Sequence, residues 1–210
     1  MSDAVQGTVR SGSEGVTVSP IQLNELGEQL TAGGLPSYTE VTRRGTGWQV
    51  MSVVAVAGLV VRPTATAAFE IWNGYPSGGK SLIIDRLFWH NLVSTNVIES
   101  FTGWAQVTTA KAAPAAGANV ITRGNTGKAY PGPVIAGLGT TVIDSGWFPW
   151  GQGFTKGAGG VVPHGVISEE VEGRLVVPPQ CSLCLHVVSS LVGQTFTQGA
   201  SWFEEYITLE

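Results

Sequence analysis

Residues 173–210 constrain the fold more than any other part of the chain, because they alternate between β-forming runs and tight turns. The run Leu175–Val177 stops at Pro178–Pro179, where two consecutive residues lack a backbone N–H and have φ fixed at about −65°. Residues 181–188 then alternate between two faces, and residues 195–209 form a further β-rich run. The pattern predicts strands joined by turns, with the last strand held inside a sheet.

The chain from Gly47 onward follows the same pattern. It predicts strands over 48–56, 67–72, 81–93 and 101–109, and shorter ones between glycines and prolines over 119–165. The 81–93 run has apolar residues on both faces, which is typical of a strand in the middle of a sandwich. This spacing, with no long helical pattern after residue 34, predicts an all-β domain over 46–210, a jelly-roll-like or Greek-key β-sandwich.

Residues 1–45 differ in composition and predict an extended N-terminal arm with one short helix at about 20–31. Ser19 suits the N-cap and Pro20 the first helical position. The three leucines on one face of this helix must be buried, either on the sandwich or on a neighbouring subunit, and they are candidate partner-binding residues: Leu23, Leu26 and Leu30.

Charged residues make up only 12% of the chain, and there are seven tryptophans. Interface cores are poor in charge and rich in aromatic side chains, so the composition suits a subunit that gives much of its surface to neighbours. A rigid β domain with a neutral surface is the alternative. The net charge of −4 and the scattered basic residues argue against nucleic-acid binding.

The longest apolar run, Val50–Val61, is interrupted and too short to cross a bilayer, so we expect no membrane partner. No signal-peptide pattern opens the chain, which favours synthesis in a cytoplasm.

Few residues point to chemistry. Cys181 and Cys184 stand three apart in a predicted strand, so they should face opposite ways as core thiols rather than share a metal or a disulfide. Residues 74–81 match G-x-x-x-x-G-K-S, but a strand pattern follows where a phosphate loop needs a helix, so we expect a turn.

The histidines and acidic residues also form no recognisable catalytic set. His90, His164 and His186 are far apart; Glu169, Glu170 and Glu172 suggest a solvated turn; and Glu204 and Glu205 should face opposite sides of a strand. We therefore expect no enzyme, catalytic residue, metal or cofactor.

An aromatic cluster offers the other candidate partner-binding residues, Trp147, Phe148 and Trp150. Such a cluster can stack on a sugar or on an apolar surface of a partner. The alternative is a loop that folds back over the end of the sandwich.

Two segments carry a family resemblance. The segment Thr64–Trp89, with I-W-N-G and G-G-K-S-L-I-I-D-R-L-F-W, and the closing G-x-T-F-T and S-W-F-E-E-Y pattern resemble small β-sandwich structural proteins encoded among tailed-phage virion genes. The resemblance covers about 40–210 and carries no catalytic residue.

The resemblance implies a virion component assembled in the host cytoplasm. It implies a capsid decoration (cement) protein that forms a homo-oligomer, often a trimer, and that joins adjacent capsomers by binding the major capsid protein. A tail or fibre protein that binds a receptor or carbohydrate through a jelly-roll module is the alternative.

Overall fold

The computed structural model of the chain describes residues 7–8, 20–21, 41–42, 45–93, 99–108, 119–138, 146–155 and 165–207. The chain divides into two units, residues 1–40 and residues 41–210. In the first unit, β1 (Gly7–Thr8) pairs antiparallel with β2 (Pro20–Ile21).

At the predicted start of the helix, Pro20 and Ile21 are extended and pair with β1. The remainder of the predicted helix, with Leu23, Leu26 and Leu30, lies outside the described residues.

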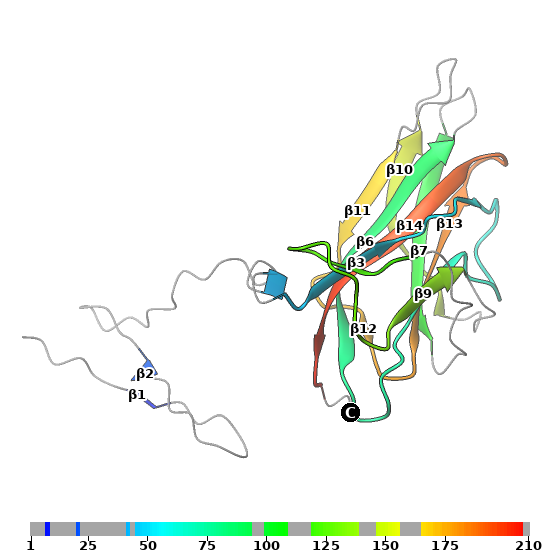
Figure 1. Cartoon of the computed structure of the whole chain (residues 1–210). Coiled ribbons are helices and arrows are strands. Elements are labelled where there is room, and N and C mark those ends of the chain that lie inside the picture. Colours follow the sequence, from blue (N-terminus) through cyan, green and yellow to red (C-terminus); the bar gives the residue numbers. More distant parts are fainter. Residues whose placement is uncertain are drawn as a thin grey trace, which may run out of the picture. The chain divides into compact units, whose positions relative to one another are not determined.

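The second unit consists of two antiparallel sheets packed face to face (Figure 1). The five-stranded sheet has the order β10 (Phe148–Thr155), β7 (Glu99–Thr108), β13 (Ser182–Ser189), β5 (Phe69–Trp72) and β9 (Ile135–Leu138). The seven-stranded sheet has the order β11 (Val166–Glu170), β6 (Ser81–Val93), β14 (Thr195–Glu205), β3 (Gly47–Met51) and β8 (Thr122–Arg123). In addition, β12 (Val176–Val177) pairs with β6, and β4 (Val56–Ala57) pairs with β14.

The strand pairs have the order of a jelly roll. The strands of the first half of the unit pair with those of the second half in reverse order, as β3–β14, β5–β13, β6–β11 and β7–β10. This is a long double-stranded hairpin. It is rolled up by two further pairings, β14–β6 in one sheet and β13–β7 in the other. The predicted β-sandwich is therefore confirmed, and of the two predicted topologies, jelly-roll-like and Greek-key, these pairings match the jelly roll.

The core lies between the sheets and is built from the inward-facing residues of alternating strands. Five aromatic side chains in it have no exposed surface: Trp89, Trp202, Phe69, Phe101 and Phe196. Phe101 of one sheet contacts Phe196 of the other, with ring centroids 5.0 Å apart. Burial of each such side chain contributes about 1.5–3 kcal/mol, so these aromatics account for much of the attraction between the sheets.

A second, smaller apolar cluster lies on the outer face of the five-stranded sheet and comprises Ala67, Trp147 and Cys184, with Trp104 against it. Cys181, by contrast, packs on the main core. The two cysteines form no disulfide and lie on different faces, as the alternation of the strand predicted.

Predicted and observed strands agree best where β-forming runs are long, and 81–93 has the predicted bounds. Two predictions of irregular structure are wrong. The aromatic segment 148–151 forms the start of β10, and Glu169 and Glu170 lie in β11 rather than in a turn. Both are edge strands, where a proline or a charged side chain is tolerated because one side of the strand has no neighbour.

The close approach of the sheets at Gly103 gives a test of this core. A Cβ atom at Gly103 would lie 2.4 Å from the Trp89 ring. We expect Gly103→Ala to lower the free energy of unfolding by about 1–3 kcal/mol, because neither sheet can move away without loss of contacts. Gly124→Ala is the matched control, since a Cβ there meets nothing closer than 3.8 Å. Urea denaturation that gave equal midpoints for the two variants would contradict this account.

Candidate functional site

The structure separates the three aromatic residues that the sequence singled out. Trp147 is only 4% exposed, and its Nε1 donates a hydrogen bond of 2.7 Å to the carbonyl oxygen of Thr64. Trp150 is half-buried against the core, with the Arg174 guanidinium 5.3 Å from its ring centre. Phe148 is 69% exposed. The three do not form one stacking platform, because Trp147 has no open ring face.

An uncharged apolar surface lies at the end of the sandwich where the turn between β13 and β14 stands. The segment 52–61 wraps this turn. Gly58 donates its N–H to Gln194 O at 3.1 Å, β4 pairs with the start of β14, and Leu59 bonds Val187 and Ser189. Neither 52–61 nor 190–194 contains a charged residue. The exposed fractions of six side chains here run from 47% to 71%, and we call them the valine end: Val53, Val54, Val60, Val61, Leu191 and Val192.

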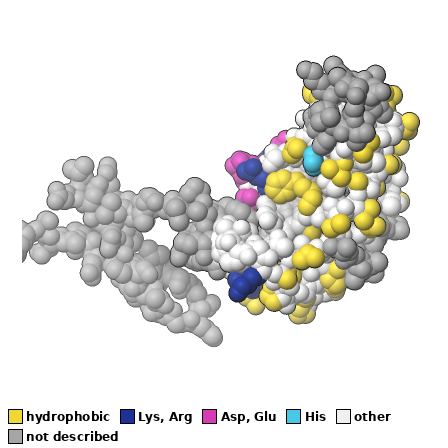
Figure 2. Space-filling model, turned by 45° about the horizontal axis from the view of Figure 1, so that its top comes forward, with side chains coloured by type: hydrophobic (Ala, Val, Ile, Leu, Met, Phe, Trp, Pro, Cys, Tyr) yellow, Lys and Arg dark blue, Asp and Glu magenta, His cyan; other side chains and the backbone are white. Residues whose placement is uncertain are grey.

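Apolar side chains are not confined to this end of the unit. Figure 2 shows hydrophobic side chains scattered among uncharged polar side chains and backbone on the visible face of residues 41–210, with charged side chains at only a few places near its margin.

The opposite end of the sandwich carries a polar cluster around a carboxylate. Glu204, near the end of β14, is 8% exposed and accepts hydrogen bonds from two phenols. Tyr75 Oη donates to its Oε2 at 2.9 Å, and Tyr130 Oη donates to its Oε1 at 2.5 Å. These residues come from the β5–β6 connection, the β8–β9 connection and β14. The cluster therefore joins three segments that are distant in sequence.

The raised pKa values of the two tyrosines keep their phenol groups protonated, so that both can donate a hydrogen bond to Glu204. Burial raises the pKa of Tyr130 far above its ordinary value, and the hydrogen bond to Glu204 raises it further. Burial also raises the pKa of Tyr75, although its hydrogen bond with Tyr130 acts in the opposite direction. A carboxylate that accepts from two neutral phenols serves as a structural joint.

The sequence analysis did not find this cluster. One signal was available, because Glu204 stands two residues after Trp202 and so faces the core side of its strand. Nothing in the sequence points from Glu204 to Tyr75 or Tyr130. Glu205 is exposed, so the two neighbouring glutamates face opposite ways as predicted.

The motif at 74–81 forms the connection between β5 and β6. Asn73 is fully buried, and its Nδ2 donates to the carbonyl oxygens of Lys80 and Val177 at 2.9 and 3.0 Å. Its Oδ1 accepts from the N–H of Tyr75 at 3.2 Å. Strand β6 begins at Ser81, so no helix N-terminus faces the loop. The predicted turn is confirmed.

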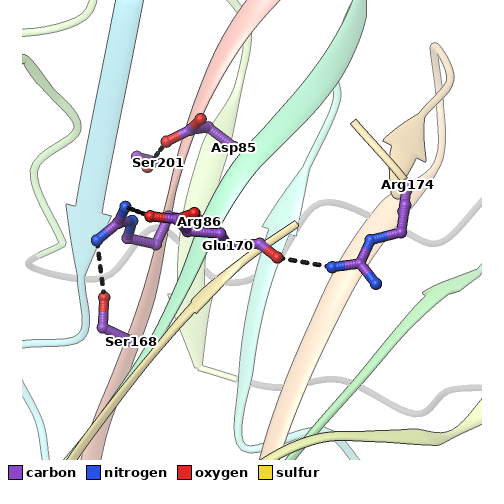
Figure 3. A network of polar contacts seen from close by, with 6 residues as sticks. All are labelled: Asp85, Arg86, Ser168, Glu170, Arg174 and Ser201. Atoms are coloured by element: carbon purple, nitrogen blue, oxygen red, sulfur yellow. Dashed lines mark hydrogen bonds and ion pairs between the residues drawn. The ribbon is translucent and has the colours of Figure 1, made fainter. Parts of the chain in front are cut away.

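A second polar network lies on the outer face of the seven-stranded sheet (Figure 3). Arg86 pairs with Glu170 and donates to Ser168 Oγ at 3.4 Å, while Arg174 Nη2 donates to Glu170 O at 2.8 Å. Asp85 accepts from Ser201 Oγ at 3.4 Å, and burial raises the pKa of its carboxyl above the ordinary value. Since the Arg86–Glu170 pair is exposed, it contributes at most about 1 kcal/mol.

The histidines are not brought together in the part of the chain that is described. His186 is buried beneath Trp147, with ring centres 6.3 Å apart, and its Nδ1 accepts from the Val187 N–H at 2.8 Å. His90 lies on β6, and His164 falls outside the described residues. Across those residues, no three His, Cys, Asp or Glu side chains lie close enough together to hold a metal ion. A search of the same residues finds no helix of the length and apolarity that a membrane span requires.

The joint at Glu204 predicts a specific stability loss. Tyr130→Phe removes a donor from a buried carboxylate, and we expect the free energy of unfolding to fall by about 1–3 kcal/mol. Tyr206→Phe, in the exposed segment after β14, is the matched control and should change it by less than about 0.5 kcal/mol. Chemical denaturation followed by tryptophan fluorescence measures both. A Tyr130→Phe protein as stable as the control would show that the contact contributes nothing.

The buried His186 predicts a dependence of stability on pH. Burial lowers its pKa below the ordinary value of 6.5, so the unfolded chain binds a proton more readily than the folded one. The contribution to stability is complete above about pH 6.5 and is lost as pH falls towards the folded pKa, with a slope of at most about 1.4 kcal/mol per pH unit. His186→Gln should flatten the profile between about pH 5 and 7. Parallel profiles for the variant and the wild type would exclude this role.

Comparisons of the sequence with protein-family models and with curated proteins, and of the structure with solved structures, found no match.

Proposed function

We propose that this chain is a structural subunit of a tailed-phage virion, a capsid decoration protein that binds the major capsid protein as a homo-oligomer. The observation that carries the proposal is the valine end. Six exposed aliphatic side chains lie on the β13–β14 turn and on the segment 52–61 that is hydrogen-bonded beside it, and neither segment contains a charged residue. A surface of this kind is stabilised when a partner covers it, by roughly 25 cal/mol for each Å² of apolar area removed from water.

The mechanism is the bridging of neighbouring capsomers. Each subunit buries its valine end against the capsid surface, and association of the subunits with one another links the capsid proteins that they contact. Because several sites then act together, dissociation of one contact leaves the subunit attached. The low share of charged residues, 12%, supports extensive contact with neighbours.

The alternative of a sugar-binding tail module receives less support from the geometry. Its stacking platform needs the open ring faces of Trp147, Phe148 and Trp150. Trp147 instead covers His186 and bonds Thr64, and Trp150 lies against the core.

Cosedimentation with purified heads of the phage that encodes the chain tests the proposal. We expect the wild type to sediment with heads, and the double variant Val60→Glu/Val192→Glu to bind at least about tenfold more weakly, because two charges would have to be buried without partners. Tyr206→Glu places a charge on an exposed side chain at the other end and should bind as the wild type does. Binding to isolated tails and not to heads would overturn the decoration role.

A further inference from the structure

A neutral trough lies on the outer face of the seven-stranded sheet. It has a volume of about 420 Å³ and is lined by Gln49, Val50, Met51, Phe88, Val120 and Thr122. Its shape follows from Gly199 on β14, which is in register with Met51 on one side and Phe88 on the other. A Cβ atom at Gly199 would lie 2.1 Å from the Val50 carbonyl oxygen. The backbones of β3 and β14 are therefore so close at this point that only glycine fits. No side chain from β14 therefore fills the space between Met51 and Phe88.

The lining of the trough selects an uncharged, apolar occupant. Met51 and Val120 are themselves exposed, and Phe88 is partly exposed. Gln49 and Thr122, which are paired across β3 and β8, add an amide and a hydroxyl. A charged group would lose its hydration here without meeting an opposite charge, whereas an aromatic ring would cover apolar area on both sides.

The same chain presents a matching side chain on a different surface. Phe148 is 69% exposed on the edge strand β10, in a segment, residues 146–155, that contains no charged residue. It stands between Trp147, which is held by its bond to Thr64, and Pro149, whose φ is fixed. The ring is thus presented on a rigid backbone, and little conformational freedom is lost when a partner covers it. Rigid, exposed aromatic residues of this kind are typical centres of interfaces.

We infer that Phe148 of one copy inserts into the trough of a second copy, and that this contact is the centre of the subunit interface. It rests on the homo-oligomer of the proposed function and names the surfaces that form it. The ring lies at the edge of the five-stranded sheet and the trough on the outer face of the other sheet, so two different surfaces meet at the contact. Repetition of such a contact builds a closed ring when its rotation closes.

Analytical ultracentrifugation of the full chain tests the contact without any capsid. The wild type should sediment as a discrete oligomer. Phe148→Ser removes the ring and Met51→Glu places a charge in the trough, and each should weaken association by about tenfold or more. The matched controls are Phe154→Ser, another exposed aromatic on β10, and Val192→Glu at the valine end, and both should keep the oligomer. Thermal unfolding followed by circular dichroism confirms that each variant is folded.

Mixed cross-linking identifies the two surfaces directly and does not require loss of assembly. In a Cys181→Ser background, Met51→Cys protein is mixed with Pro149→Cys protein, which keeps the Phe148 ring, and the mixture is oxidised. We expect a disulfide-linked dimer from the mixture and little from either protein alone, because the contact joins one trough to one ring.

The outcomes separate this inference from the function proposed above. A monomeric wild type, an oligomer that survives both Phe148→Ser and Met51→Glu, or the absence of the mixed cross-link would overturn the contact. The monomeric wild type would also overturn the homo-oligomer of the proposed function, whereas the other two results leave binding to heads through the valine end unchanged. Conversely, if the protein forms the cross-link but does not bind phage heads, the contact between copies is supported and the decoration role is overturned.

Discussion

The pairing of β14 with β6 is the contact on which the rest of the structure depends. It joins β6, in the first half of the 41–210 unit, to β14 near its end over most of the length of both strands, and it turns a long hairpin into a closed roll. Until this pairing forms, the first and second halves of the unit can meet only edge to edge, and the inward-facing aromatics have no opposite sheet to cover them. The entropy cost of bringing distant segments together rises only slowly with the length of the chain between them, so a large shared core can offset it.

The same pairing determines where the polar groups lie. Because β14 runs through the middle of its sheet, Trp202 and Ala200 face the core and Glu204, at its end, emerges under Tyr75 and Tyr130. The register with β3 and β6 places Gly199 between Met51 and Phe88 and leaves the trough open. One strand thus determines a structural joint at one end and a vacant space on the outer face.

Local patterns in the sequence predicted most of the long strands. They predicted the arrangement of the strands only as far as the fold class, a β-sandwich. The 81–93 strand and the opposite faces of Cys181 and Cys184 follow from alternation along one segment, which needs no knowledge of neighbours. The strand at Phe148–Trp150 could not be predicted in this way. Pro149 is acceptable only in an edge strand, and which strand lies at the edge is known only once the order of strands in the sheet is known. The Tyr75–Tyr130–Glu204 joint and the trough depend on long-range register, which no local pattern contains. Of the candidate partner-binding residues, Phe148 is the one whose side chain is mostly exposed among those described.

The direction of the strands gives the domain a polarity. Gly47 at the start of β3 pairs with Phe203 near the end of β14, so the chain enters and leaves the jelly roll at the same end, away from the valine end. The attachment points of sequence before residue 47 and after residue 205 therefore lie side by side on the 41–210 unit. A foreign peptide fused after residue 205 would therefore be attached at the end of the roll opposite the β13–β14 turn.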